Sequence, residues 1–381
     1  MKTSSRLTAS VVLFWSSALA QTHLAVPTKQ KPKPPIPVFE VALSDDTDYA
    51  SLPAKDWAEK SLPEATCNGD GNLYISIGGR GLVALTPEGV VPFLSDQMTD
   101  IPHPSATGLG LDPDISAGKV SFRVSGIDDS KVKTTTWTDE DGHAHTDRDA
   151  TDAAIHYIAR FDRDGTYKGA IKLDLPFLIF KFATFDSGTI LAQGMDQNKA
   201  PRIALLDTSA QFMRYLDLRK DISTSLGASD EDVKCKGCTE SALSVVISSY
   251  FIPWNGKMLF WRAFMNQPSV YEVQESGEAR LVRLKATEEY EIGQPVRSDR
   301  NWLLRVRKAN GGGIDAHDSL LEVDPRNGEP LREYRIKEPD KFSKAIVSCF
   351  FDGEFWGVRH DEKERNIKVV RGQASLRGKE K

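Results

Sequence analysis

The sequence predicts an all-β fold, a six-bladed β-propeller closed by an N-terminal strand that completes the last blade. Three observations support this prediction. Similar segments recur along residues 37–371, each with an apolar strand, a turn that bears Asp, Asn or Gly, and a second strand. Consecutive strand residues are apolar, as in 73–75 and 258–260, which is expected when both faces of a sheet are covered. The two ends of the chain also complement each other.

The first 20 residues have the pattern of a cleavable signal peptide. Two basic residues, Lys2 and Arg6, precede an apolar run that ends in Ala18-Leu19-Ala20. The run is too short and too rich in Ser to span a bilayer well, and no second such run follows it. We therefore predict cleavage after Ala20 and a secreted or periplasmic protein with no membrane span.

The rest of the chain divides into three parts. Residues 21–36 are rich in Pro and Lys and predict a disordered linker, residues 37–371 predict a single propeller domain, and residues 372–381 predict a charged tail. Removing the two basic residues of the signal peptide from 49 basic and 54 acidic residues leaves a net charge of −7. This mildly acidic balance gives no electrostatic reason to expect a nucleic-acid partner. We expect a monomer.

The repeated units are visible as hairpins and tight turns. Hairpins lie at 82–94, 157–173, 202–218, 270–284 and 320–336, and further strand pairs turn tightly at 68–75, 186–192, 254–260, 298–304 and 351–357, with a looser version at 111–122. The second residue after this turn is always apolar: Leu73, Val120, Ile190, Met258, Trp302 and Phe355. A pair of β-sandwiches would also give short, evenly spaced strands, but it would not require such self-similarity.

The last unit lacks a fourth strand, because the chain stops in a charged tail after the strand at 367–370. An alternating strand at 38–43 has no hairpin partner nearby. If it pairs with 367–370, it closes the ring and removes two exposed sheet edges.

This pattern resembles the six-bladed propellers of the NHL-repeat and lactonase-like group over nearly the whole mature chain. The resemblance to calcium-dependent lactonases implies acidic and Asn residues at the channel end of the inner strands, holding one divalent ion. Glu64 matches the first ligand position. The inner strands FKFATF, VVISSYF, IGQPVR and AIVSCFF carry no Asn or Asp at the later positions. A metal-dependent lactonase-like hydrolase is therefore the alternative function.

The four cysteines suggest disulfides, since an even number is typical of an exported protein. Cys67 and Cys349 each lie four residues before the Gly of their turns, in units that would be neighbours across the closure. A bond between them would staple the ring, provided that their Cα atoms lie within about 7 Å. Cys235 and Cys238 form a C-x-x-C pair, for which a loop disulfide is favoured over redox chemistry.

The long loops predict which face is functional. In a four-stranded blade, the loops joining strands two to three and each blade to the next share one face, and these hold the irregular sequence, including the insertion at 126–155. Long loops on a rigid scaffold commonly carry binding sites. The candidate ligand-binding residues near this face are His103, Arg123, Arg262, Arg305, Arg359 and His360. Guanidinium groups could grip a carboxylate, sulfate or phosphate, or could pair with loop carboxylates.

Two loops have the residue types of a metal site. His143 and His145 precede several Asp residues, and His317 and Asp318 lie on another loop. The stretch around His143 is equally well interpreted as a solvated hairpin that turns at Asp141-Gly142. No cofactor is predicted, and a divalent metal enters only as a weak candidate.

We therefore predict an exported, non-catalytic propeller that binds a ligand or partner through its long-loop face. The expected ligand is an anionic small molecule, a glycan or a protein. Redox participation through Cys235 and Cys238 is the weakest hypothesis.

Overall fold

The computed structural model describes residues 36–53, 65–67, 71–77, 80–106, 113–116, 118–149, 153–198, 200–216, 249–262, 269–282, 284–285, 290–308, 319–337, 345–361 and 365–376. All of them belong to the compact unit Ile36–Lys381. The predicted signal peptide, almost all of the linker and the Cys235–Cys238 pair lie outside these residues. None of the helices in the described ranges has the length and apolar character needed to cross a membrane.

The described chain is built from β-strands, with two short 3-10 helices, η3 (Ser95–Gln97) and η4 (Asp129–Lys131). Four separate sheets each contain four antiparallel strands. The first sheet holds β4 (Ala65–Thr66), β5 (Leu73–Ser76), β6 (Gly81–Thr86) and β7 (Gly89–Leu94), and the second holds β8 (Asp114–Ser116), β9 (Lys119–Ile127), β12 (Ala154–Asp162) and β13 (Tyr167–Lys172). The third holds β14 (Phe177–Thr184), β15 (Ile190–Asp196), β16 (Pro201–Leu206) and β17 (Phe212–Tyr215), and the fourth holds β18 (Tyr250–Trp254), β19 (Lys257–Arg262), β20 (Ser269–Val273) and β21 (Ala279–Val282).

Ten further strands form one sheet that contains two antiparallel runs, while β10 and β11 form a separate two-stranded sheet. The first run is β22 (Tyr290–Ser298), β23 (Trp302–Lys308), β24 (Ser319–Val323) and β25 (Pro330–Lys337), and the second is β26 (Ala345–Phe351), β27 (Glu354–Asp361) and β28 (Asn366–Leu376). A short parallel pairing between β22 and β26, with Arg297 opposite Cys349, joins the two runs.

The N-terminal strands complete this sheet, although the strand at 38–43 does not lie opposite residues 367–370 as predicted. β1 (Val38–Ala42) pairs in parallel with β25 and antiparallel with residues 374–376 of β28, which closes the sheet on itself. β2 (Ser44–Asp45) and β3 (Leu52–Pro53), rather than the strand at 38–43, lie opposite residues 366–371. The reason is that β28 continues through Leu376, past the predicted start of the tail, so that three short N-terminal segments lie along one long strand.

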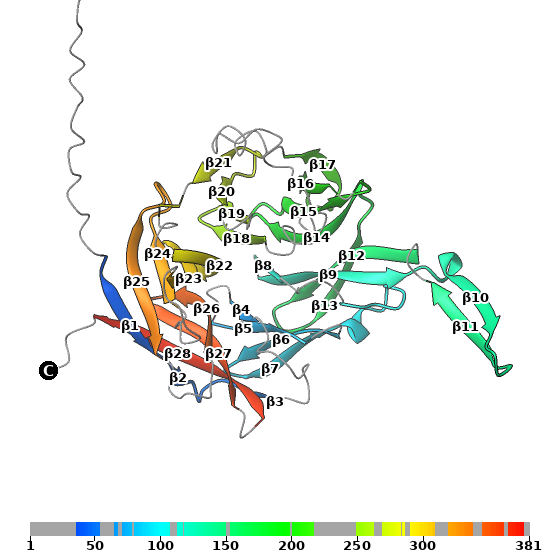
Figure 1. The fold of residues 1–381 in the computed structure, drawn as a ribbon, viewed down its shortest axis with the longest axis horizontal. Helices are drawn as coiled ribbons and strands as arrows, with labels where there is room; N and C mark the ends of the chain where they lie inside the picture. Colours follow the sequence, from blue (N-terminus) through cyan, green and yellow to red (C-terminus); the bar gives the residue numbers. More distant parts are fainter. Residues whose placement is uncertain are drawn as a thin grey trace, which may run out of the picture. The chain divides into compact units, whose positions relative to one another are not determined.

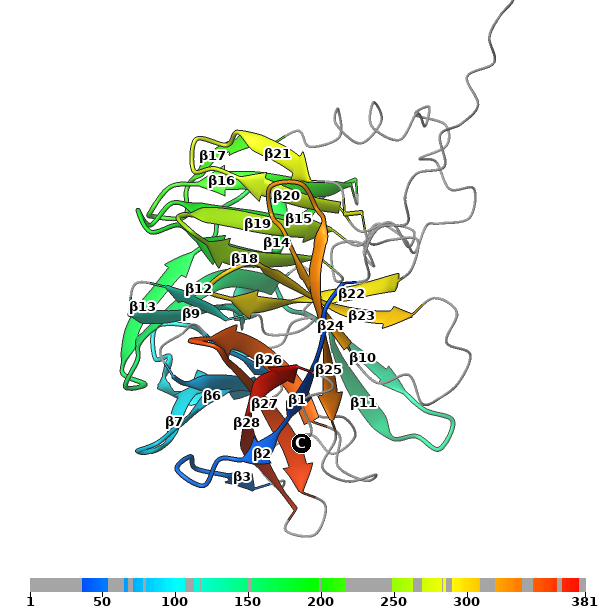
Figure 2. The same ribbon diagram turned by 90° about the vertical axis from the view of Figure 1, so that its left-hand side faces the viewer.

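The sheets are arranged in a propeller-like way around a common centre (Figure 1). Contacts link β8 to β14, β14 to β18, β18 to β22, and β26 to β4, while β22 pairs with β26. These are the first strands of their antiparallel runs, so each run presents its first strand to the centre. Figure 2 shows the same sheets from the side, with the outer strands β17 and β21 at the top of their two sheets and the inner strands β14 and β18 below them.

The core lies between neighbouring sheets, as the apolar strands predict. In β5, Tyr74 packs toward Phe93 and Phe161 on one side, whereas Leu73 and Ile75 pack toward Val358 and Ile367 on the other. In β19, Met258 and Phe260 join one apolar cluster, and Leu259 and Trp261 join another. Because both faces of a sheet are buried in this way, each sheet depends on both neighbours for its apolar burial.

A disulfide joins the first sheet to the last run. Cys67 follows β4 and Cys349 lies in β26, and their Cα atoms are 6.1 Å apart. The bond spans 282 residues of sequence, so it ties together two ends of the described chain. The predicted pairing of Cys67 with Cys349 is therefore present.

The insertion at 126–155 forms a two-stranded hairpin, β10 (Lys133–Thr138) and β11 (Ala144–Asp149), with Gly142 in the turn at φ 84°. The hairpin extends beyond the ends of β9 and β12 (Figure 1), and every residue of its two strands is exposed. This confirms the solvated hairpin that the sequence offered as one interpretation of this stretch.

Candidate functional site

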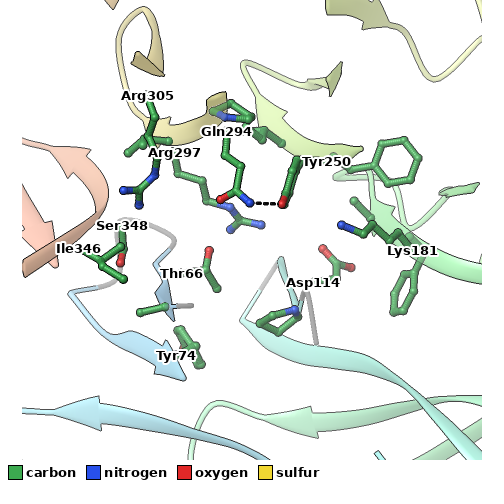
Figure 3. A pocket seen from close by; sticks show the side chains of 18 residues that line it. Thr66, Tyr74, Asp114, Lys181, Tyr250, Gln294, Arg297, Arg305, Ile346 and Ser348 are labelled. Atoms are coloured by element: carbon green, nitrogen blue, oxygen red, sulfur yellow. Dashed lines mark hydrogen bonds between the residues drawn. The ribbon is translucent and has the colours of Figure 1, made fainter. Parts of the chain in front are cut away.

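A cavity of about 230 Å³ lies where the first strands meet. It is lined by residues of β4, β8, β14, β18, β22 and β26, together with Tyr74 of β5 and Arg305 of β23. Figure 3 shows polar side chains pointing into it from several of these strands. The site is therefore a product of the whole ring of sheets and not of one loop.

Irregular pairing in the inner strands positions the polar side chains. The register shifts between Ile179 and Lys181 in β14, between Ile292 and Pro295 in β22, and between Val347 and Cys349 in β26. Such β-bulges re-aim side chains relative to the regular alternation of a strand. Lys181, Gln294 and Ser348, which lie at or next to these shifts, all line the cavity.

Glycine on the second strand makes two of these bulges possible. Gly194 lies opposite Ile179, and Gly357 lies opposite Val347. A Cβ atom would stand 1.8 Å from the Leu178 carbonyl oxygen at the first position and 2.3 Å from the Ile346 carbonyl oxygen at the second. The two backbones thus approach each other too closely for any side chain.

Three cationic side chains line the cavity. Lys181 is only 6% exposed, and its Nζ lies 4.1 Å from the ring centroid of Tyr250, within cation–π range. Arg297 donates from Nη1 to the Cys67 carbonyl oxygen at 3.3 Å, and Arg305 donates from Nη2 to the Val347 carbonyl oxygen. Main-chain carbonyl groups therefore orient both guanidinium groups.

One carboxyl group, that of Asp114, lines the same cavity. It is 2% exposed, and its Oδ2 accepts from Ser116 Oγ at 3.3 Å. Its buried Oδ1 has no hydrogen-bond partner in the part of the chain that the structure describes. Burial raises the pKa of Asp114 above its ordinary 3.8. Hydrogen bonds from Thr184 and the charge of Arg297 lower the pKa but do not cancel this rise.

This raised pKa predicts a pH-dependent cost to stability. Between 3.8 and the raised pKa the folded state binds more protons than the unfolded state, so the free energy of unfolding falls as the pH rises. Asp114→Asn should therefore melt at a higher temperature than wild type at pH 8, and this difference should shrink toward pH 4.

The measurement is a series of thermal melts from pH 4 to 8. Asp162→Asn is the matched control, because it removes a partly exposed carboxyl group of β12 that lies beside Lys168 and outside the cavity. A wild-type minus Asp114→Asn difference that stays constant across this range would contradict the prediction.

The cavity also contains neutral polar groups. Gln294 Nε2 donates to the Tyr250 hydroxyl group, a contact drawn in Figure 3. The buried Ser348 Oγ has no hydrogen-bond partner among the described residues. Hydroxyl, amide and carboxyl groups thus accompany the three cations, with Phe182, Phe251 and Ile252 supplying apolar surface.

Of the six residues predicted to bind a ligand, Arg305 lines the cavity. Arg123 lies over the ring of Phe180, with its guanidinium carbon 5.8 Å from the centroid, and burial lowers its pKa. Arg359 Nε donates to Asp45 Oδ1 at 2.9 Å, and His103 Nε2 lies 2.8 Å from Asp129 Oδ2. The structure does not bring these three together.

The other two predicted residues give less information. His360 lies in β27 opposite Ile367. Arg262 ends β19, where the structure describes its backbone only.

Of the predicted metal-binding residues, the structure describes His143 and His145 but not the others. His143 Nδ1 and His145 Nε2 lie 3.4 Å and 2.7 Å from Asp139 Oδ2, at the tip of the β10–β11 hairpin. His317, Asp318 and Glu64 lie outside the described residues. Within the described ranges, no cluster of three or more His, Cys, Asp or Glu side chains could hold a metal ion.

Sequence reasoning missed Asp114, Lys181, Gln294, Arg297 and Ser348. A usable signal was present, because each polar residue interrupts or borders an apolar inner strand, as Lys181 does in FKFATF. A charged residue is rarely buried without a partner or a function.

No protein family matches the sequence, and no curated protein matches it. Among solved structures, a catalytically inactive virginiamycin B lyase from Staphylococcus aureus with quinupristin is 12% identical, covers 87% of this chain and 99% of its own, and has a TM-score of 0.40. Trypanosoma rangeli sialidase is 10% identical, covers 87% of this chain and 57% of its own, and has a TM-score of 0.38. Pyrococcus horikoshii acylaminoacyl peptidase is 13% identical, covers 70% and 45%, and has a TM-score of 0.34. Likeness at this level carries no conclusion about the activity of this chain.

Proposed function

We propose that this protein is an exported six-bladed propeller that binds a small anionic molecule in its central cavity. The observation that carries the proposal is the charge of the lining: Lys181, Arg297 and Arg305 against the single carboxyl group of Asp114. The role is one of binding, and the proposed site is the cavity where the first strands meet.

The surroundings of these cations support a strong interaction with an anion. Aromatic and aliphatic side chains line the cavity beside them, which lowers the local dielectric and strengthens the attraction between unlike charges. Guanidinium groups pair with planar anions through two parallel hydrogen bonds. Since main-chain carbonyl oxygens already orient both arginines, little side-chain ordering remains to oppose binding.

The cavity volume limits the size of the ligand. At about 230 Å³, it exceeds the cavity of about 150 Å³ that holds benzene. It is smaller than the roughly 300–1,000 Å³ typical of drug-sized ligands. We therefore expect a compact carboxylate, phosphate or sulfate rather than an extended glycan or a protein segment.

Export follows from the signal peptide that the sequence predicts, with cleavage after Ala20. The disulfide between Cys67 and Cys349 supports this, since such bonds persist in oxidising compartments.

Titration calorimetry of the mature chain with carboxylates, inorganic phosphate and sulfate tests the proposal. At least one of these anions should bind with a Kd below about 1 mM, corresponding to about −4 kcal/mol. Its neutral amide or ester should bind at least about tenfold more weakly. Equal binding of the neutral analogue, or no binding by any anion, would overturn the proposal. Divalent-dependent turnover of a lactone would instead support the lactonase-like alternative.

A further inference from the structure

We infer that the anion bound in the central cavity also carries a hydroxyl group, which Lys181 and Asp114 recognise together. The ligand class is thus a small hydroxy acid. This inference rests on the proposed function, and it names the chemistry of the end of the cavity opposite Arg305.

Lys181 and Asp114 come from neighbouring inner strands. β14 and β8 are in contact, and both side chains are more than nine-tenths buried. In the view of Figure 3 their charged ends point toward the same part of the cavity, while Arg305 and Ser348 lie on the other side. The guanidinium group of Arg297 lies between the two sides. The cavity therefore has one cationic end and one end of mixed charge.

The mixed end has an unmet hydrogen-bonding capacity. Asp114 lines the cavity. Thr184 and Ser116 hydrogen-bond to its carboxyl group, whereas its buried Oδ1 has no hydrogen-bond partner among the described residues. A buried polar atom without a partner costs about 1–3 kcal/mol, so a ligand that supplies the missing hydrogen bond gains a corresponding amount.

A hydroxyl group can form hydrogen bonds with both side chains at once. The ammonium group of Lys181 can only donate, and an ionised carboxylate can only accept. A hydroxyl group accepts from the first and donates to the second, and it also pairs with Asp114 in its protonated form. A ligand ammonium group would be repelled by the charge of Lys181, and a second carboxylate would be repelled by ionised Asp114. A keto oxygen could accept from Lys181 but could not donate a hydrogen bond to the ionised carboxylate of Asp114.

The test compares ligands that differ at a single carbon. One series is malate, succinate and aspartate, with hydroxyl, hydrogen and ammonium at the same position, and a second is mandelate, phenylacetate and phenylglycine. In at least one series the hydroxy acid should bind about 5- to 150-fold more tightly than the other two, the range given by about 1–3 kcal/mol.

Variants of Asp114 separate recognition from folding. In Asp114→Leu the preference for the hydroxy acid should fall to within about twofold, while the affinity for succinate or phenylacetate stays the same or rises because a negative charge is lost. Asp114→Asn, which keeps a hydrogen-bonding amide, should retain part of the preference. The matched control Asp162→Leu, at a partly exposed position on β12 outside the cavity, should leave the preference intact.

The outcomes distinguish this inference from the proposed function. Equal affinity of the wild-type protein for hydroxy and deoxy acids would overturn the inference and leave anion binding standing. A hydroxyl preference that survives in Asp114→Leu would also overturn it. If no member of either series binds, and phosphate and sulfate do not bind, then both fail.

Discussion

Substitution of Arg297 by Gln is expected to weaken binding of the tightest anion about 30- to 700-fold. Arg297 lies in the middle of the cavity in Figure 3, where its charge faces the proposed anion from a site with apolar walls. Truncating one partner of a buried, hydrogen-bonded charge pair costs about 2–4 kcal/mol or more, and each 1.4 kcal/mol is tenfold in Kd. Glutamine keeps an amide that can donate to the Cys67 carbonyl oxygen, so the loss should come from the charge.

Titration calorimetry on the folded variant measures this loss of affinity. Two further variants show whether the loss comes from the charge of Arg297. Arg297→Lys keeps the charge without the planar fork and should fall between wild type and Arg297→Gln. Arg359→Gln is the matched control, since Arg359 is held by Asp45 outside the cavity. An Arg297→Gln variant that melts like wild type and binds the anion within about threefold of wild type would remove the central cavity from consideration. Equal losses in Arg297→Gln and Arg359→Gln would point to the long-loop face that the sequence predicts.

The sheets could be predicted because their determinants are local. Turn residues such as Asn255-Gly256 and Asp352-Gly353 fix where the chain reverses, and both pairs have positive φ in the structure. Apolar residues at both odd and even positions of a strand, as in β5 and β19, indicate that both faces of a sheet are covered. Equivalent positions in the first and last units also explain why Cys67 and Cys349 could be matched in advance.

The cavity could not be predicted in the same way, because its side chains depend on bulges. Counting alternate residues from a turn assumes a regular ladder, whereas one extra residue reverses the face that every later side chain occupies. The shifts at Ile179, Ile292 and Val347 do this in three inner strands. No feature of a single strand indicates such a shift, since it depends on how closely Gly194 or Gly357 lets the neighbouring backbone approach. The three predicted arginines whose side chains are described, Arg123, Arg305 and Arg359, therefore occupy separate environments, and of these Arg305 lines the cavity.

Removal of the Cys67–Cys349 disulfide is expected to cost about 5 kcal/mol of unfolding free energy and roughly 5–10 °C in Tm. The value follows from the 282-residue separation of the two cysteines. Closing so long a loop lowers the conformational entropy of the unfolded chain, and removing the bond restores that entropy and stabilises the unfolded state. The β22–β26 pairing beside Cys349 consists of two residue pairs, so it holds β26 in place only weakly and leaves the disulfide as the stronger constraint on the position of Cys349. Denaturant unfolding of the Cys67→Ala/Cys349→Ala variant measures the loss.

The same variant should also bind the anion more weakly, although neither cysteine touches the proposed ligand. Arg297 donates to the Cys67 carbonyl oxygen and lies opposite Cys349 in the β22–β26 pairing, so the disulfide holds both structures that position its guanidinium group. Adding a reductant to the wild-type protein should reproduce the variant in stability and affinity, whereas Cys235→Ala/Cys238→Ala should leave the affinity unchanged. If the Cys67→Ala/Cys349→Ala variant unfolds at the wild-type denaturant concentration, the pairing of the sheets alone closes the ring. If it unfolds earlier but binds the anion with wild-type affinity, the site is positioned independently of that closure.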